Sequence, residues 1–137
     1  MERLRRLNQC ADEFWNAVTS AARKLHATEE LKIGAGDLIV AVVENDRNTI
    51  TIRNQGRNTT YPFADLPAGL ALAIARRSMN EDDPQVQVLF GAGLMTVKDL
   101  KPVYIDEARR YWERAAASGA DVEDLQATLT DSYKLVP

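Results

Sequence analysis

The sequence predicts an α+β fold with an N-terminal helix, a small three-stranded antiparallel sheet, a helical hairpin and a C-terminal capping helix. Two observations lead to this prediction. Residues 38–63 contain short β-type segments separated by turn residues, and the segments on either side place apolar side chains at helical spacing. Because no helix separates the strands, they are expected to form an antiparallel sheet beside the helices.

The chain length of 137 residues is typical of one domain that buries its own core. Apolar residues make up 45% of the chain and charged residues 27%, as in folded rather than disordered proteins. We therefore expect a single compact domain over residues 1–137. Its parts are a helix at 1–30, the small sheet at 31–66 and a helical part at 67–137.

Residues 2–27 are predicted to form one amphipathic helix. Apolar side chains recur there every three or four positions, on one face: Leu4, Leu7, Ala11, Phe14, Val18, Ala22 and Leu25. The residues from Thr28 to Glu30 end or bend this helix. Residues 31–33 are compatible with a short edge strand.

The first two strands are predicted from their apolar patterns. Residues 38–43 are six consecutive apolar residues rich in β-branched types, which indicates a strand buried on both faces. Residues 49–53 alternate, so Ile50 and Ile52 are expected to point inward and the threonines to solvent.

The third strand follows a turn at Asn54, Gln55 and Gly56, residue types that tolerate positive φ. Tyr61 and Phe63 are expected to share the face of the isoleucines. Pro62 has no backbone N–H, so this strand is predicted to lie at an edge of the sheet.

Four more helices and their boundaries are predicted in the remaining residues. Asp65 is expected to cap a helix over 66–79, and the acidic run at 80–83 to cap a second helix over 84–95. Pro102 is expected to exclude helix before a third helix, which runs from Asp106 to the glycine at 119. A final helix is expected over 121–133.

The predicted helical hairpin resembles one repeat of the tetratricopeptide or Sel1-like kind, over residues 84–120. Residues 89–94 read LFGAGL and residues 108–119 read ARRYWERAAASG. Small residues are needed where the two helices of such a repeat touch, and Gly91 is expected at their closest approach. The family stacks about three or more units, whereas this chain has one unit and a following helix.

The predicted sheet resembles the SH3-like modules called SLA1 homology domain 1, over residues 38–67. The shared pattern consists of VV at 42–43, TITI at 49–52, a glycine turn at 56, YPF at 61–63 and DLP at 65–67. The combined layout is also similar to C-terminal modules of large multidomain planctomycete proteins. That resemblance implies that the chain is part of a larger bacterial protein.

Few residues could support catalysis or bind a cofactor or metal. His26 is the only histidine, and Cys10 is the only cysteine, which excludes an internal disulfide and fits a reducing, cytoplasmic compartment. Arg6 could lower the pKa of Cys10, but a core position is the favoured interpretation. The carboxylates at 81–83 lack the spacing of a calcium loop. We therefore expect no enzyme activity, no metal and no cofactor.

The charges are distributed unevenly along the chain. Five arginines and one carboxylate lie between residues 47 and 79, whereas eleven carboxylates and six bases follow from residue 80. The expected function is a protein-interaction or scaffold module with a protein or peptide partner. Candidate binding residues are Tyr111 and Trp112 in the helical groove, and Arg53, Arg57 and Tyr61 at the hairpin. The alternative is a nucleic-acid-binding small barrel that uses the basic hairpin.

Overall fold

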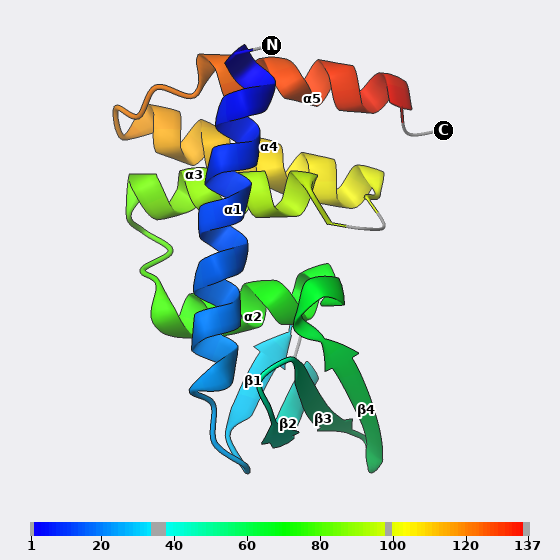
Figure 1. Ribbon diagram of the computed structural model, residues 1–137. Coiled ribbons are helices and arrows are strands. Elements are labelled where there is room, and N and C mark those ends of the chain that lie inside the picture. The colour runs from blue at the N-terminus through cyan, green and yellow to red at the C-terminus, as the bar shows by residue number, and fades with distance from the viewer. Residues whose placement is uncertain (1, 34–37, 98–99, 136–137) are drawn as a thin grey trace. The chain divides into compact units, whose positions relative to one another are not determined.

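The computed structural model describes residues 2–33, 38–97 and 100–135, with side chains described from residue 5 to residue 129 of these ranges. The fold is α+β, as predicted (Figure 1). Its contacts group into two compact units, one of residues 1–15 and 79–137 and one of residues 16–78. The helix α1, Glu2–Arg23, contributes residues to both units. The expectation of one domain stays a prediction.

The second unit contains a four-stranded antiparallel sheet in the order β1-β2-β3-β4. The strands are β1 (Glu30–Ile33), β2 (Leu38–Asn45), β3 (Thr49–Asn54) and β4 (Arg57–Pro62). Three strands were predicted, and the fourth is β1, the short edge strand that pairs with β2. In Figure 1 each strand lies next to its neighbour in the sequence.

The two faces of this sheet are covered unequally. The isoleucines of β3 are buried as predicted, at 0% exposure for Ile50 and 5% for Ile52. The prediction that residues 38–43 are buried on both faces is wrong, because Ile39 is 51% exposed while Val40 and Val42, on the opposite face of β2, are buried. An apolar run cannot distinguish one covered face from two, and here the face that carries Ile39 is the less covered one.

Thr51 also departs from the sequence pattern, since it is only 8% exposed. Its hydroxyl Oγ lies 2.6 Å from the Oγ of Thr60 on the neighbouring strand. A cross-strand hydroxyl pair of this kind satisfies two polar groups at once and stabilises the sheet. The threonine expected to face solvent is therefore part of the sheet's packing.

The turn between β3 and β4 has the backbone that its residues predict. Gln55 has φ of 54° and Gly56 has φ of 78°, as required at both central positions of a two-residue type I′ turn. The turn's length pairs Asn54 with Arg57 and Arg53 with Asn58. It fixes the register of the whole hairpin.

Two helix boundaries in the second unit differ from the prediction. The helix α1 ends at Arg23, four residues before the predicted end at residue 27. A 3₁₀ turn, η1 (Phe63–Asp65), contains Asp65, and α2 (Ala68–Ser78) begins only after Pro67. Asp65 is therefore not the N-cap of α2. Burial of Phe63, which is 6% exposed, favours the tight turn before the helix.

The first unit is helical and contains α3 (Pro84–Met95), α4 (Pro102–Ala117) and α5 (Glu123–Leu135). Figure 1 shows α3 and α4 side by side and antiparallel, as predicted for the helical hairpin. Asp83 caps α3 by accepting a 2.9 Å hydrogen bond from the N–H of Gln85. In the part of the chain that the structure describes, no helix is both long and apolar enough to span a membrane.

The ends of α4 correct one prediction and confirm another. Pro102 is the first residue of α4, whereas it was expected to exclude helix. Proline is tolerated there because the first N–H groups of a helix have no helical partner. Gly119 has φ of 99°, and the N–H groups of Gly119 and Ala120 bond to the carbonyls of Ala116 and Ala115. This is the expected glycine C-terminus.

Candidate functional site

The hairpin of β3 and β4 holds three of the five predicted binding residues. Arg53 and Arg57 flank the two-residue turn, and Tyr61 lies near the other end of β4. Arg53 is exposed and donates from Nε to Oδ1 of Asn58 at 2.9 Å. Arg57 is exposed, and its side chain forms no hydrogen bond or ion pair with any described residue. Its guanidinium group is therefore available to a ligand.

The register divides these residues between the two faces of the hairpin. Tyr61 pairs with Ile50, so it lies on the isoleucine face, and Arg57 shares this face because alternate residues of a strand point the same way. Arg53 is three positions after Ile50 and lies on the opposite face. The structure thus brings Arg57 and Tyr61 to one face and separates them from Arg53.

The other arginines of the basic segment do not extend this site. Arg47 lies in the turn between β2 and β3, at the opposite end of β3 from Arg53. Arg77, in α2, forms a 3.0 Å ion pair with Glu29 and donates to the carbonyl of Glu30. The positive charges between residues 47 and 79 are therefore spread over the second unit rather than gathered in one patch.

The hairpin nevertheless has a consistent sign of charge. Residues 49–62, which form the hairpin, include two arginines and no carboxylate. The strand β4 lies at the edge of the sheet, and five of its six residues are exposed while Tyr61 is half-buried. An exposed edge next to unbalanced positive charge can attract an extended acidic chain.

A shallow depression of about 340 Å³ lies at the other end of the sheet, lined by Arg23, Asn45, Asp46 and Arg47. Its polar groups are already used within the protein. Arg23 donates to the carbonyl of Arg47 at 3.0 Å, and Nδ2 of Asn45 donates to the carbonyls of Ala22 and Leu25. These contacts hold the end of α1 against the sheet.

Asp46 belongs to the turn at this depression. Its carboxylate accepts hydrogen bonds from the N–H of Asn48 at 2.7 Å, the N–H of Thr49 at 2.8 Å and the hydroxyl of Thr49 at 3.0 Å. The bonds from Asn48 and Thr49 hold the pKa of Asp46 below its ordinary value. The carboxylate therefore stabilises the turn between β2 and β3.

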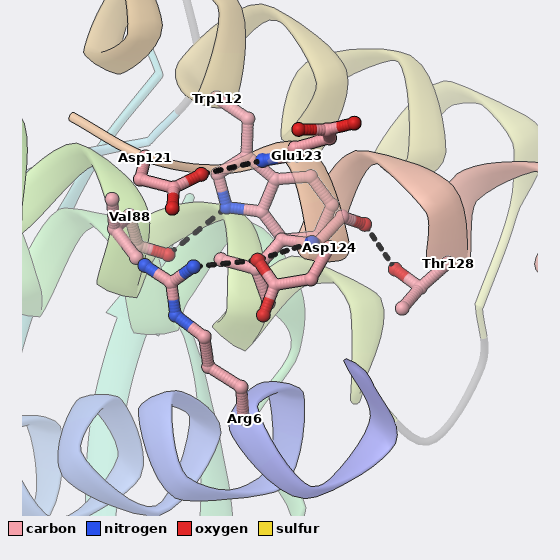
Figure 2. Close-up of polar contacts among 8 residues, drawn as sticks. Arg6, Val88, Trp112, Asp121, Glu123, Asp124 and Thr128 are labelled. Carbon is pink, nitrogen blue, oxygen red and sulfur yellow. Dashed lines mark hydrogen bonds and ion pairs between the residues drawn. The ribbon is translucent and has the colours of Figure 1, made fainter. Parts of the chain in front are cut away.

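Trp112 and Tyr111 belong to the core of the first unit, which corrects their assignment to a binding groove. Trp112 is 0% exposed, and its indole N–H donates to the carbonyl of Val88 at 3.1 Å (Figure 2). Tyr111 is 6% exposed, and its hydroxyl donates to Oε2 of Glu81 at 2.7 Å. The physical reason is that α3 and α4 pack directly on each other, so that both side chains are buried.

The same unit contains an ion pair between helices distant in sequence. Figure 2 shows Arg6 of α1 pointing toward Asp124 of α5, with Nη1 and Oδ1 2.5 Å apart. Beside it, the hydroxyl of Thr128 donates to the carbonyl of Leu125 at 2.6 Å. These interactions are internal to the helical unit.

A smaller depression of about 160 Å³ lies on α4 and is lined by Glu107, Arg110, Tyr111 and Arg114. It combines charges of both signs. Arg114 also approaches Asp82, with 3.6 Å between Nη2 and Oδ1. Because positive and negative groups alternate at this surface, it selects no single class of charged ligand.

Cys10 is half-buried, and the acidic run at residues 81–83 takes part in hydrogen bonds and ion pairs within the protein. Burial raises the pKa of the half-buried Cys10 thiol and outweighs the lowering effect of Arg6. Asp83 caps α3, as described above, and Asp82 lies near Arg114. Among the residues that the structure describes, no three His, Cys, Asp or Glu side chains are grouped as metal ligands would be.

Sequence reasoning missed one feature of the hairpin, namely which backbone N–H and C=O groups of β4 point away from β3. The signal was present, because a two-residue turn at Gln55 and Gly56 sets the pairing of every later residue. The alternation also determines which N–H groups point away from the sheet.

Comparisons with protein-family models, with curated proteins and with solved structures give no match to this chain. The resemblances to Sel1-like repeats and to SH3-like modules therefore stay predictions.

Proposed function

We propose that this chain is a non-enzymatic protein-interaction module that binds an acidic, extended segment of a partner protein at the β3–β4 hairpin. One observation carries the proposal: the edge strand β4 is exposed beside Arg57, whose guanidinium has no described partner, on a hairpin without carboxylates. Positive charge attracts an acidic partner, and a sheet edge offers backbone groups to an extended one.

A nucleic-acid-binding role is the alternative, and the positions of the arginines argue against it. A protein that follows a phosphate backbone uses several positive groups along one groove, usually with aromatic side chains for base stacking. Here Arg53 and Arg57 lie on opposite faces, and Arg77 is paired with Glu29. The net charge of −3 also disfavours binding to a polyanion.

The finer fold assignments belong to the same proposal. An SH3-like relationship of the sheet is supported by the tight type I′ turn and the 3₁₀ turn that follows β4. A Sel1-like relationship of α3 and α4 is supported by the small residues at their contact. Both would suit a cytoplasmic scaffold module in a larger bacterial protein.

Fluorescence anisotropy with three labelled probes would test the proposal. The probes are a six-residue peptide of alternating glutamate and valine, the same peptide with lysine for glutamate, and a mixed-sequence single-stranded oligonucleotide. The glutamate peptide should bind more tightly than the lysine peptide. The oligonucleotide should bind more weakly at moderate salt, since its affinity falls steeply as salt rises.

Variants would locate the binding surface. Arg57→Ala should weaken binding of the glutamate peptide by about two- to fivefold, the range for an exposed ion pair. Arg53→Ala should have less effect, because Arg53 is one strand further from the edge and bonded to Asn58. Arg110→Ala removes the same charge from α4 and is the matched control. Equal losses in all three variants, or tight salt-sensitive oligonucleotide binding, would refute the proposal.

A further inference from the structure

We infer that the acidic segment binds as a fifth strand on the free edge of β4, a mode that rests on the proposed function. The order β1-β2-β3-β4 leaves β4 without a strand on its outer side among the described residues. Strand addition gains affinity from main-chain hydrogen bonds, so it needs backbone donors and acceptors that point away from the sheet.

The register shows which backbone groups of β4 point outward. In an antiparallel pair, residues alternate between pairs that exchange hydrogen bonds with the opposite strand and pairs that do not. A two-residue turn makes its flanking pair, Asn54 and Arg57, a bonded pair. Counting along β4, Thr59 and Tyr61 then bond inward to β3, while Asn58 and Thr60 direct N–H and C=O outward.

Two further observations agree with this assignment of inward and outward backbone groups along β4. The N–H of Phe63 donates to the carbonyl of Asn48 at 2.9 Å, which continues the inward series of odd-numbered residues. Pro62 falls in the outward series, where its missing N–H removes no bond to β3. The proline also marks the end of the usable edge, since it offers a carbonyl but no donor.

The outward groups can be reached by a partner. Asn58 and Thr60 are both exposed, and so are their neighbours Arg57 and Thr59. The edge thus presents two N–H groups and at least two carbonyls over residues 58–60, enough for a short extended segment. Side chains of the added strand alternate between faces, and those on the Arg57 face come beside its guanidinium group.

Charge distinguishes an acidic partner from a second copy of this chain. Pairing of two β4 edges would bring together two hairpins, each with two arginines and no carboxylate over residues 49–62. Like charges at close range oppose that association. A strand with glutamate or aspartate at alternate positions instead places a carboxylate next to Arg57.

Backbone methylation of the probe peptide tests strand addition on the unmodified protein. In the peptide of alternating glutamate and valine, the N–H groups of the two residue types point to opposite edges. One version carries N-methyl groups on the internal valines and the other on the internal glutamates. Strand addition uses one edge, so one version should bind at least about tenfold more weakly and the other should keep its affinity.

The outcomes separate this inference from the proposed function. Equal affinity of both methylated versions with the parent peptide would refute strand addition and leave acidic-peptide binding intact. Equal loss for both would also refute it, because a single pairing edge cannot explain that result. No binding of the parent peptide would refute both proposals.

A protein variant provides a second test. Thr60→Pro removes the outward N–H of Thr60 without removing a backbone bond to β3, although it also loses the hydroxyl contact with Thr51. It should weaken peptide binding by about tenfold. Thr60→Val is the matched control, since it loses the same hydroxyl but keeps the N–H, and its affinity should be unchanged. Circular dichroism would check that both variants fold. If Thr60→Pro does not fold, the methylated peptides decide.

Sedimentation of the protein alone would test for the second copy. The wild type should stay monomeric over the concentrations used for binding. A concentration-dependent dimer that Thr60→Pro abolishes would show that another copy occupies this edge, and would overturn the assignment to an acidic partner.

Discussion

The indole ring of Trp112 in α4 lies against the backbone of Gly91 in α3. A β-carbon added at Gly91 would lie 2.2 Å from Nε1 of Trp112, far inside van der Waals contact. The indole N–H reaches the carbonyl of Val88 one turn earlier in α3. Glycine at position 91 therefore allows the largest side chain of the unit to be buried with its hydrogen bond satisfied.

We predict that Gly91→Ala lowers the free energy of unfolding by about 1–3 kcal/mol through overpacking. A fall in the free energy of unfolding would be informative, because alanine in a helix is otherwise favoured over glycine by about 1 kcal/mol. Urea unfolding followed by circular dichroism would measure the change.

Gly69→Ala in α2 is the matched control for that substitution. The added β-carbon there meets only Cγ2 of Ile33, at 2.9 Å, the end of a side chain that can shift. Its effect on the free energy of unfolding should therefore be smaller. A Gly91→Ala protein as stable as Gly69→Ala would show that the ring of Trp112 is not held against α3.

The second prediction concerns the turn between β3 and β4. Gln55 adopts φ of 54°, a region that asparagine occupies more readily than glutamine. Gln55→Asn should raise the free energy of unfolding by about 0.5–1 kcal/mol. The same change at the exposed helical position Gln9 should instead lower it by a few tenths, roughly the difference in helix propensity. Thermal unfolding of both variants would test the opposite signs.

The third prediction is a pH dependence at Asp46. Because its pKa in the folded protein lies below the ordinary value of 3.8, the carboxylate stabilises the fold above that value. The stabilisation is lost as pH falls through the lowered pKa. The difference in thermal midpoint between the wild type and Asp46→Ala should therefore be largest near neutral pH and shrink below about pH 4.

Asp46→Asn is the control for this pH dependence. The amide oxygen of asparagine can accept the same N–H groups and does not titrate in this range. The difference in thermal midpoint between Asp46→Asn and Asp46→Ala should stay constant from pH 2 to pH 7, a range around the usual aspartate pKa of about 3.9. A wild-type advantage that grows toward low pH would contradict the assignment.

The fourth prediction concerns the reactivity of Cys10. Burial raises the pKa of its thiol, so less of the nucleophilic thiolate is present at neutral pH. Alkylation by iodoacetamide should be slower in the native protein than in the urea-unfolded chain at the same pH. Arg6→Ala should slow it further, because Arg6 lowers the pKa. Faster alkylation in the native state would indicate an activated thiol.

Local features of the structure could largely be predicted from the sequence. The alternation around Ile50 and Ile52 predicted the strand, and Asp83 before a proline predicted the start of α3. Gly91 was correctly placed at the contact of two helices. Each depends on residues within a few positions, where backbone geometry and capping bonds decide the conformation.

The structure separates the candidate binding residues that the sequence suggested. Arg57 and Tyr61 share a face of the hairpin, but Arg53 lies on the other face and Trp112 is fully buried. An aromatic pair on a helix is compatible with a binding surface or with a core. Whether such a pair is a binding surface or a core depends on where the neighbouring helix lies, and a local sequence pattern does not determine that position.

The sequence by itself determined the elements of this protein, the turn at Gln55 and Gly56, and the edge position of β4, because these depend on dihedral preferences and on a missing N–H at Pro62. Only the tertiary structure decided which faces are covered. It exposed Ile39, the second of six consecutive apolar residues, and it buried Trp112 against Gly91. Burial depends on packing between residues distant in the chain, and the free energy gained from it is realised only when those surfaces meet.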